Sequence, residues 1–365
     1  MVETDHRASQ GLKAAAGNIL FWDSRGSETV CCGPEEYISF LQTIQRICLL
    51  CICERSFHKI FMSKNNQVKH KTPGYQKKEW FWGYLMIAPV TIGLAVFYIY
   101  PFFLTFYNSF LKIGSFNVSS WGGLTNYQKL LTDASMWNTL KNTVRYVVFT
   151  IPAILFLALL IAVLLNVKIR GKAVYRVLYF LPYVTMAAAI SMVWKWMFNG
   201  DYGLINYVLG IFGIEGRRWL TDTATAPYAI ILVSIWSGIG YNMIILLAGI
   251  QGISTTYYEA ARIDGASAVD MFFRITLPLV TPTLFFLLVT DLISAFQIFD
   301  TIYMMIGKNT VVLENTQSIV MYFYRNAFEL KQKGYASAIA MLLFVLIMII
   351  TLIQMALQKK WVNYD

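Results

Sequence analysis

Charged residues are scarce in this chain of 365 residues: Asp, Glu, Lys and Arg together make up 14% of it, against about 25% in an average soluble domain. Hydrophobic residues make up 57%, and the mean hydropathy is +0.53. A soluble core does not need that much apolar surface, so the composition indicates an integral membrane protein. The net charge of +10 does not indicate nucleic-acid binding, because much of the basic excess lies near the ends of apolar segments.

Residues that usually carry chemistry are also missing from the apolar body. The five cysteines all lie within the first 53 residues, and the three histidines all precede residue 80. We find no spacing typical of a zinc site and no nucleophile paired with a base, so we expect no catalytic residues, no metal and no cofactor. No phosphate-binding Gly-x-x-x-x-Gly-Lys-Ser/Thr loop occurs, so any energy from ATP must come from another chain.

Long apolar runs are what the sequence has instead. A helix needs about 20 apolar residues to cross a bilayer with its backbone groups bonded internally. Six stretches meet this requirement: 82–106, 145–168, 175–197, 227–250, 279–305 and 336–357. We therefore predict an all-α integral membrane protein, with six transmembrane helices in a permease-type domain over residues 80–358, surrounded by membrane lipid.

Basic residues are concentrated on one side of these predicted spans. They lie before span one, between spans two and three, and after span six, whereas the other connections mix fewer basic residues with acidic ones. Because cytoplasmic loops carry the excess of Lys and Arg, we predict that both termini are cytoplasmic in a cell membrane of bacterial type. Residues 62–79 are then a basic cytoplasmic segment, and residues 359–365 are a cytoplasmic tail.

Residues 1–61 form an N-terminal extension that does not fit this pattern. It lacks the basic start and apolar run of a signal peptide, and its one apolar stretch is too short and too polar to span. Three explanations remain open. The stretch 37–53 is an interfacial helix, the extension is a disordered part of the protein, or it is not translated because the chain begins at Met62.

The connection between predicted spans four and five, residues 254–282, reads as two short helices and a bend. Thr256 and Glu259 have the spacing of a capping box, and Gly265 is suited to end a helix in the left-handed conformation. Ser267 and Asp270 cap a second helix, and Pro278 marks the turn into span five. From these residues alone, a hairpin lying on the bilayer surface fits almost as well as a docking element for another protein.

The run Glu259-Ala-Ala-Arg-Ile-Asp-Gly-Ala266, with Leu277-Pro278 after it, resembles the signature loop of binding-protein-dependent ABC importer permeases. The likeness is strongest to the sugar subfamily, of the maltose and glycerol-phosphate type, and extends from about residue 80 to the C-terminus. Further similar stretches are Thr125-Asn-Tyr127, Tyr175-Arg-Val-Leu-Tyr-Phe-Leu-Pro182, Gly203-Leu-Ile-Asn206, Phe296-Gln-Ile-Phe-Asp300 and Gly334-Tyr-Ala-Ser-Ala338. The chain departs from the family in three respects. Met305-Ile-Gly-Lys-Asn-Thr310 replaces the usual glycine-rich stretch, the large periplasmic insertion of the maltose type is missing, and the N-terminal extension has no counterpart.

This resemblance implies that the loop is a cytoplasmic coupling element that docks into a separate ATP-hydrolysing subunit. The matching residues are Glu259, Ala260, Ala261, Asp264 and Gly265 for docking, with Leu277 and Pro278 setting the exit angle. The implied partners are two ATP-hydrolysing subunits, a second, related permease and an extracytoplasmic sugar-binding protein. The chain itself is then not an enzyme.

Polar residues within the predicted spans are candidates for the substrate pathway, because such residues face a bundle interior or a water-filled cavity. Thr290, Ser294, Gln297 and Thr301 have the spacing of one helical face in span five. The candidate pathway residues are Trp236, Tyr241, Asn242, Asp291, Ser294, Phe296, Gln297 and Asp300. The alternative is that these Ser and Thr residues only bond neighbouring helices together.

The expected function is the import of a carbohydrate by alternating access, driven by ATP hydrolysis on partner chains. The alternative is an ion-coupled secondary transporter, in which Asp291 is the carboxylate linked to the ion.

Overall fold

The computed structural model describes residues 21–22, 28–29, 74–113, 119–167, 170–307 and 310–362. The chain divides into two compact units, residues 1–98 and 99–365. The predicted extension 1–61, the basic segment 62–79 and the tail 359–365 lie outside the described residues, apart from residues 21–22, 28–29, 74–79 and 359–362.

The first unit holds two short strands and one long helix. Strand β1 (Phe21–Trp22) pairs antiparallel with β2 (Glu28–Thr29). Helix α3 (Gly74–Leu94) runs directly into a π-helical turn, η1 (Ala95–Ile99), and then into α4 (Tyr100–Ser109) of the second unit. The turn precedes Pro101, which has no N–H to donate to the preceding helical turn, so the regular bonding pattern changes there.

The second unit is a helical bundle. Its elements, in chain order after α4, are β3 (Leu111–Ile113), β4 (Ser119–Trp121), α5 (Thr125–Thr132), α6 (Ala134–Asn166), α7 (Lys172–Val184), α8 (Ala187–Met197), α9 (Leu204–Ile211), α10 (Ala226–Gln251), α11 (Thr255–Ile263), α12 (Ala268–Met271), the π-helical turn η2 (Phe272–Thr276), α13 (Leu277–Leu279), α14 (Thr281–Phe296), α15 (Asp300–Ile306), α16 (Thr310–Thr316), α17 (Ile319–Tyr324), the π-helical turn η3 (Arg325–Glu329) and α18 (Lys333–Trp361).

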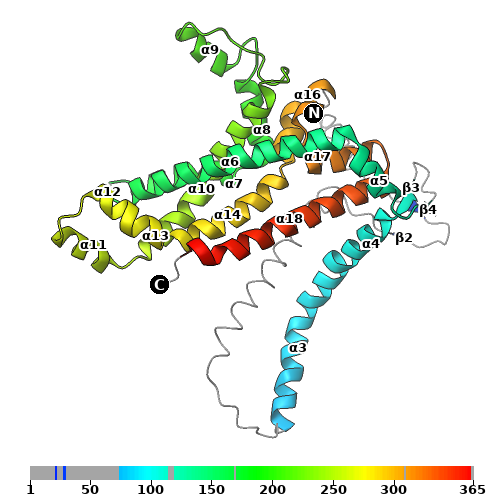
Figure 1. Cartoon of the computed structure of the whole chain (residues 1–365), viewed down its shortest axis with the longest axis horizontal. Coiled ribbons are helices and arrows are strands. Elements are labelled where there is room, and N and C mark those ends of the chain that lie inside the picture. Colours follow the sequence, from blue (N-terminus) through cyan, green and yellow to red (C-terminus); the bar gives the residue numbers. More distant parts are fainter. Residues whose placement is uncertain are drawn as a thin grey trace, which may run out of the picture. The chain divides into compact units, whose positions relative to one another are not determined.

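The core lies where α6, α10 and α14 meet, and α18 packs against α14 and α4 (Figure 1). Ala158 and Ala162 of α6 are fully buried against Met243 and Leu246 of α10. Small residues at such positions let two helix backbones approach closely, which is how membrane helices gain packing energy without a hydrophobic driving force between them. Gly240 serves the same purpose toward α7, because a Cβ at residue 240 would overlap the carbonyl oxygen of Tyr179.

Four helical runs are long and apolar enough to cross a membrane: Trp80–Ser109, Ala134–Asn166, Ala226–Gln251 and Lys333–Gln358. They correspond to predicted spans one, two, four and six. Two further pairs of helices pass the same test but are bent, so the described chain has four to six candidate spans. The prediction of an all-α membrane protein is thus confirmed at this level.

Predicted spans three and five are wrong as single helices. Span three is α7 followed by α8, bent by 95°, because Thr185 ends α7 with extended backbone. Pro182 contributes to this break, since it cannot donate a hydrogen bond within the last turn of α7. Span five was expected over residues 279–305, but α14 ends at Phe296, well before that end. The 62° bend between α12–α13 and α14 lies at the turn that Pro278 was predicted to mark, so it agrees with the prediction.

Candidate functional site

The predicted coupling loop consists of two short helices joined by a left-handed turn. The first helix, α11, follows Ser254, whose hydroxyl accepts a hydrogen bond from the amide of Thr256 at 3.4 Å. The predicted capping box at Thr256 and Glu259 is therefore wrong, because Thr256 already lies inside the helix and cannot adopt the backbone of a cap. Gly265 does leave the helix with φ of +77°, which confirms its predicted role.

The second half of the loop has its own cap and a bond to the first half. The Ser267 hydroxyl accepts from the Asp270 amide, and the Asp270 carboxylate accepts from the Ser267 amide, both at 3.2 Å. This is the predicted second capping box. Tyr258 on α11 shares a hydrogen bond of 2.9 Å with Thr276 at the end of η2. The two halves therefore form one compact hairpin.

The loop offers an uncovered surface at one end of the bundle, remote from α5 and α17 (Figure 1). Ile263 is 87% exposed and Phe273 is 59% exposed. Of the residues predicted to dock, Glu259, Ala260, Asp264 and Gly265 are exposed, while Ala261, Leu277 and Pro278 are half-buried. Large apolar side chains this exposed, beside polar ones, are typical of a surface that another molecule covers.

Two of the predicted pathway residues meet across helices. Asn242 on α10 donates from Nδ2 to the Gly238 carbonyl at 3.0 Å and to Asp291 Oδ1, on α14, at 3.2 Å. The remaining oxygens, Asn242 Oδ1 and Asp291 Oδ2, are buried and have no hydrogen-bond partner among the described residues. Two such acceptors lack donors, and a buried acceptor without a donor is costly.

The two predicted aromatic residues of α10 contact rings on the broken span α7–α8. Tyr241 stacks on Tyr183 with centroids 4.7 Å apart, and Trp236 meets Trp194 edge-on at 5.4 Å. Both arrangements are favourable geometries for aromatic pairs. Trp236 remains 42% exposed, so one part of its ring is uncovered.

The predicted polar face of span five is wrong, because its members do not lie on one helix. Thr290 and Ser294 belong to α14, and each hydroxyl bonds a carbonyl of its own helix. Phe296 ends α14 and is buried; Gln297 is the C-cap and is also buried. Asp300 is exposed and begins α15 after the break. Helical spacing cannot reveal such a break, since the apolar run continues through it.

Sequence reasoning missed a cluster around Asp133, the N-cap of α6. Its Oδ2 accepts from the hydroxyls of Tyr322 at 2.6 Å and Tyr335 at 2.5 Å, and its Oδ1 accepts from the Ser135 amide at 3.0 Å. Lys129 lies 4.3 Å above the Tyr335 ring. We call Asp133, Tyr322 and Tyr335 the Asp133 hub; it joins the start of α6 to α17 and α18.

The hub keeps the Asp133 carboxylate charged and the Tyr322 phenol protonated. Burial alone would raise the pKa of Asp133, but the hydrogen bonds from Tyr322, Tyr335 and backbone amides outweigh burial and lower it. Burial, together with the Asp133 carboxylate, raises the pKa of Tyr322 to about 12. An Asp before Ala-Ser at the start of an apolar run is a cap signal, but its partners are 189 and 202 residues away in the chain.

The second missed feature is the segment from α16 through η3, residues 310–329, which we call the buried unit. All residues from Ile319 to Phe323 of α17 are buried. Side chains of α6 bond its backbone, in three contacts: Tyr146 donates to the Thr316 carbonyl at 2.5 Å, Thr143 accepts from the Ile319 amide at 3.1 Å, and Asn142 donates to the Glu314 carbonyl at 3.3 Å. The Ser318 hydroxyl donates to the Ile298 carbonyl, at the break after α14, at 2.5 Å.

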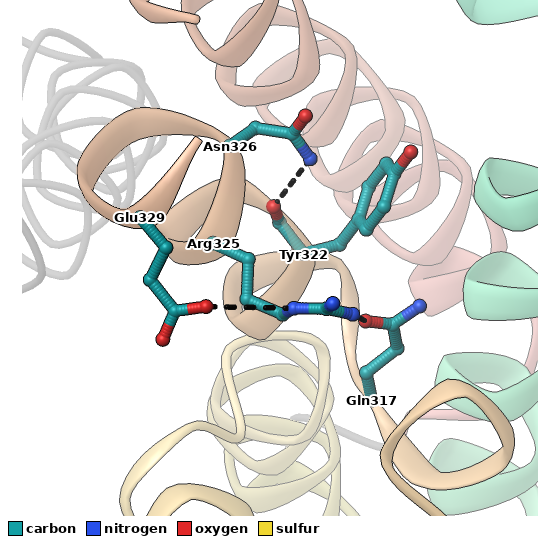
Figure 2. Close-up of polar contacts among 5 residues, drawn as sticks. All are labelled: Gln317, Tyr322, Arg325, Asn326 and Glu329. Atoms are coloured by element: carbon teal, nitrogen blue, oxygen red, sulfur yellow. Dashed lines mark hydrogen bonds and ion pairs between the residues drawn. The ribbon is translucent and has the colours of Figure 1, made fainter. Parts of the chain in front are cut away.

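The end of the buried unit is organised by charge and amide groups. Figure 2 shows Arg325 between Gln317 and Glu329: it donates to the Gln317 side chain at 3.0 Å and pairs with Glu329 at 3.7 Å. Asn326 donates to the Tyr322 carbonyl at 2.9 Å. Gln317 and Asn326 are buried, so these bonds satisfy polar groups that would otherwise be costly.

Fold and site together define a multi-span α-helical membrane protein with a capped, exposed hairpin at one end. A family profile described as "binding-protein-dependent transport system inner membrane component" matches residues 138–363. The chain belongs to this family, and it is therefore the permease subunit of an ATP-binding-cassette importer. This decides between the two transport classes considered from the sequence in favour of the ATP-driven one.

Similar permease proteins match most of the chain. A probable ABC transporter permease protein of Bacillus subtilis is 38% identical over 286 residues, which are 78% of this chain and 92% of the relative. A sulfoquinovosyl glycerol transport system permease protein of Agrobacterium fabrum is 34% identical, covering 73% of this chain and 87% of the relative. A trehalose/maltose transport system permease protein of Thermococcus litoralis is 34% identical, covering 74% and 91%.

Among solved structures, a chain of a bacterial ABC transporter involved in the import of the acidic polysaccharide alginate has the same fold. Its TM-score is 0.70 at 22% sequence identity, covering 79% of this chain and 98% of that one.

Proposed function

We propose that the chain is one of two permease subunits of a carbohydrate importer. The bent pair α7–α8 then crosses the bilayer once, and α14 begins the fifth crossing after its 62° bend, which makes six spans over residues 80–358. Both termini and the coupling loop lie on the cytoplasmic side, where basic residues are dense. The basic segment 62–79 and the tail 359–365 flank this domain, after an N-terminal extension over residues 1–61.

The observation that carries the carbohydrate assignment is the similarity to permeases named for sulfoquinovosyl glycerol and for trehalose and maltose. The two acceptors without donors on Asn242 and Asp291 fit a ligand rich in hydroxyl groups, because each hydroxyl can donate one hydrogen bond. Both oxygens are buried in this conformation, so a ligand reaches them only after the surrounding helices move. Tyr241, next to Asn242, and Trp236 supply aromatic faces on the same helix, as sugars require.

Coupling to ATP is proposed to pass through the exposed hairpin. Glu259, Ala260, Ala261, Asp264 and Gly265 contact one of two ATP-hydrolysing subunits, and the step from α13 into α14 at Leu277 and Pro278 carries the movement into the membrane. The small side chains at Ala260 and Gly265 let the partner surface approach closely. An extracytoplasmic sugar-binding protein delivers the substrate on the other side, to a cavity shared with the second permease.

The test is carbohydrate uptake into vesicles that contain the complete importer, alongside ATP hydrolysis stimulated by the loaded binding protein. Gly265→Asp should abolish both activities while the subunit still inserts and assembles, because the position has φ of +77° and faces open space at the expected interface. Glu259→Ala, which introduces no backbone strain, should reduce both in parallel.

Gly171→Asp is the matched control. Gly171 also has a positive φ, of +76°, and also faces open space, but it lies in the link between α6 and α7. It shares the strain of the Gly265 substitution without the proposed contact, so its uptake should stay near that of the unmodified importer. Normal uptake by both Gly265→Asp and Glu259→Ala would refute the coupling assignment, and uptake of no carbohydrate by the unmodified importer would refute the substrate class.

A further inference from the structure

Helix α9, beyond the end of α8 (Figure 1), presents one apolar side that nothing in the described chain covers. Leu204, Tyr207, Val208 and Ile211 are spaced at i, i+3, i+4 and i+7, so they share one helical face. They are 43%, 71%, 42% and 68% exposed, respectively. We call these four residues the α9 stripe. Ile205, on another face of α9, packs toward the core formed by α8 and its neighbours.

Hydrogen bonds tie α9 to both ends of the loop that carries it, so the stripe has a defined direction. The Asn206 side chain joins the two ends of the loop: its Nδ2 donates to the carbonyls of Gly200 and Arg217, both at 2.9 Å. Its Oδ1 accepts from the Arg217 amide at 3.1 Å and from Trp219 Nε1 at 2.7 Å. A loop that fixes an apolar helix this firmly orients it toward a particular surface.

We propose that the α9 stripe lies in the lipid interface of the bilayer, in the leaflet where α8 ends. Chain continuity places it there, because α9 begins only seven residues after Met197, the last residue of α8. Lys195 and Trp196 in the last turn of α8 are exposed and are typical of a span reaching the headgroup region. A helix with one apolar face at this depth inserts that face among the upper acyl chains.

The basic residues near α9 indicate which class of lipid would surround the helix. Arg217 and Arg218, at the base of the loop that holds α9, are exposed, as is Lys195. Their side chains can reach phosphate groups while the stripe is in the apolar layer, because long basic side chains extend from an apolar surface to the interface. Anionic phospholipid headgroups are therefore the partner that fits, since they complement both the apolar stripe and the cations.

The test measures the depth of single nitroxide labels on the complete importer in vesicles of phosphatidylcholine with phosphatidylglycerol. The five native cysteines, all within the first 53 residues, are first replaced by serine. Tyr207→Cys and Ile211→Cys are labelled separately, so that a folding defect at one leaves the other. Both labels should lie roughly 5–10 Å into the headgroup–acyl boundary, accessible to oxygen and shielded from a water-soluble nickel complex.

Asp201→Cys is the matched control, because Asp201 is exposed in the same loop but off the stripe. Its label should contact the nickel complex freely. Stripe labels that behave like residue 201 would place α9 in water, and labels shielded from both oxygen and nickel would place it against protein, such as the second permease; either result overturns the proposal.

A second variant tests whether the negative charge of the lipid headgroup contributes to the depth of the α9 stripe. With Arg217→Gln and Arg218→Gln together, the stripe labels should become shallower in the anionic vesicles and match their depth in vesicles of phosphatidylcholine alone. An unchanged depth in the anionic vesicles would overturn the headgroup assignment. These depths do not depend on which substrate is transported, so their failure would leave the carbohydrate assignment intact.

Discussion

The proposed coupling loop, residues 254–282, and the buried unit, residues 310–329, contain similar elements but differ in burial. Each contains short helices followed by a π-helical turn, η2 or η3. None of the residues of α11 is buried, whereas five consecutive residues of α17 are. The surface of the first segment is uncovered, as its proposed coupling role requires, whereas the second segment is covered by its own chain.

The hydrogen bonds of the two segments differ in the sequence separation of the residues that they join. In the loop, the side-chain bonds described above join residues at most 18 positions apart. Those between α6 and the buried unit join residues 170 or more positions apart. Substitutions in the buried unit should therefore reduce the stability of the whole permease, and substitutions in the loop should affect coupling with little effect on stability.

The largest expected effect comes from removing the acceptor at the Asp133 hub. Asp133→Ala leaves the hydroxyls of Tyr322 and Tyr335 without their shared carboxylate, at a cost of about 2–4 kcal/mol. Tyr322→Phe and Tyr335→Phe each remove one donor and should cost less. The measurement is the thermal unfolding midpoint of the purified importer. An unchanged midpoint in Asp133→Ala would mean that water accepts the hydrogen bonds of Tyr322 and Tyr335 instead, and that the Asp133 hub does not stabilise the fold.

A smaller effect should separate two serines that perform the same local task. Ser318 and Ser267 are both N-caps, of α17 and α12. Ser318→Ala also loses the bond to the Ile298 carbonyl, so it should destabilise the permease by roughly 1–3 kcal/mol. Ser267→Ala should cost about 1 kcal/mol or less and affect only the loop. Equal shifts in the unfolding midpoint would contradict the distinction between the two regions.

The smallest effect concerns pH. The pKa of Asp133 is lowered from its ordinary value of 3.8, so its contribution to stability is present above that value and is lost as pH falls below it. Tyr322 stays protonated well above pH 9, because its pKa is raised to about 12. The difference in unfolding midpoint between the unmodified importer and Asp133→Asn should therefore be constant from pH 5 to pH 9. A change near neutral pH would show that Asp133 titrates there.

Local signals in the sequence predicted local structure well. The helix of the fourth predicted span was expected at 227–250 and extends over Ala226–Gln251, and the turn at Gly265 and the capping box at Ser267 were predicted from residue type. Thr256 was misplaced because Ser254, two residues earlier, competes for the same cap. The breaks at Thr185 and after Phe296 were missed because hydropathy continues through them.

Long-range contacts could not be predicted from a single sequence. Nothing near Asp133 identifies Tyr322 or Tyr335 as its partners, and nothing in the apolar run of α6 identifies Tyr146 as a donor to Thr316. The Asn242–Asp291 pair was foreseen only as two separate polar residues, because their contact depends on how α10 and α14 pack.

The break after α14 has a mechanical consequence. Helix α14 is 16 residues long, which makes it a rod of about 24 Å. At its start it follows α13 and thus the coupling loop; just past its end, the carbonyl of Ile298 is fastened to Ser318. A displacement at the loop would therefore reach the buried unit without a compliant joint other than the 62° bend before Thr281. The stiffness of α14, rather than a series of side-chain contacts, would then set how closely the buried unit follows a movement of the coupling loop.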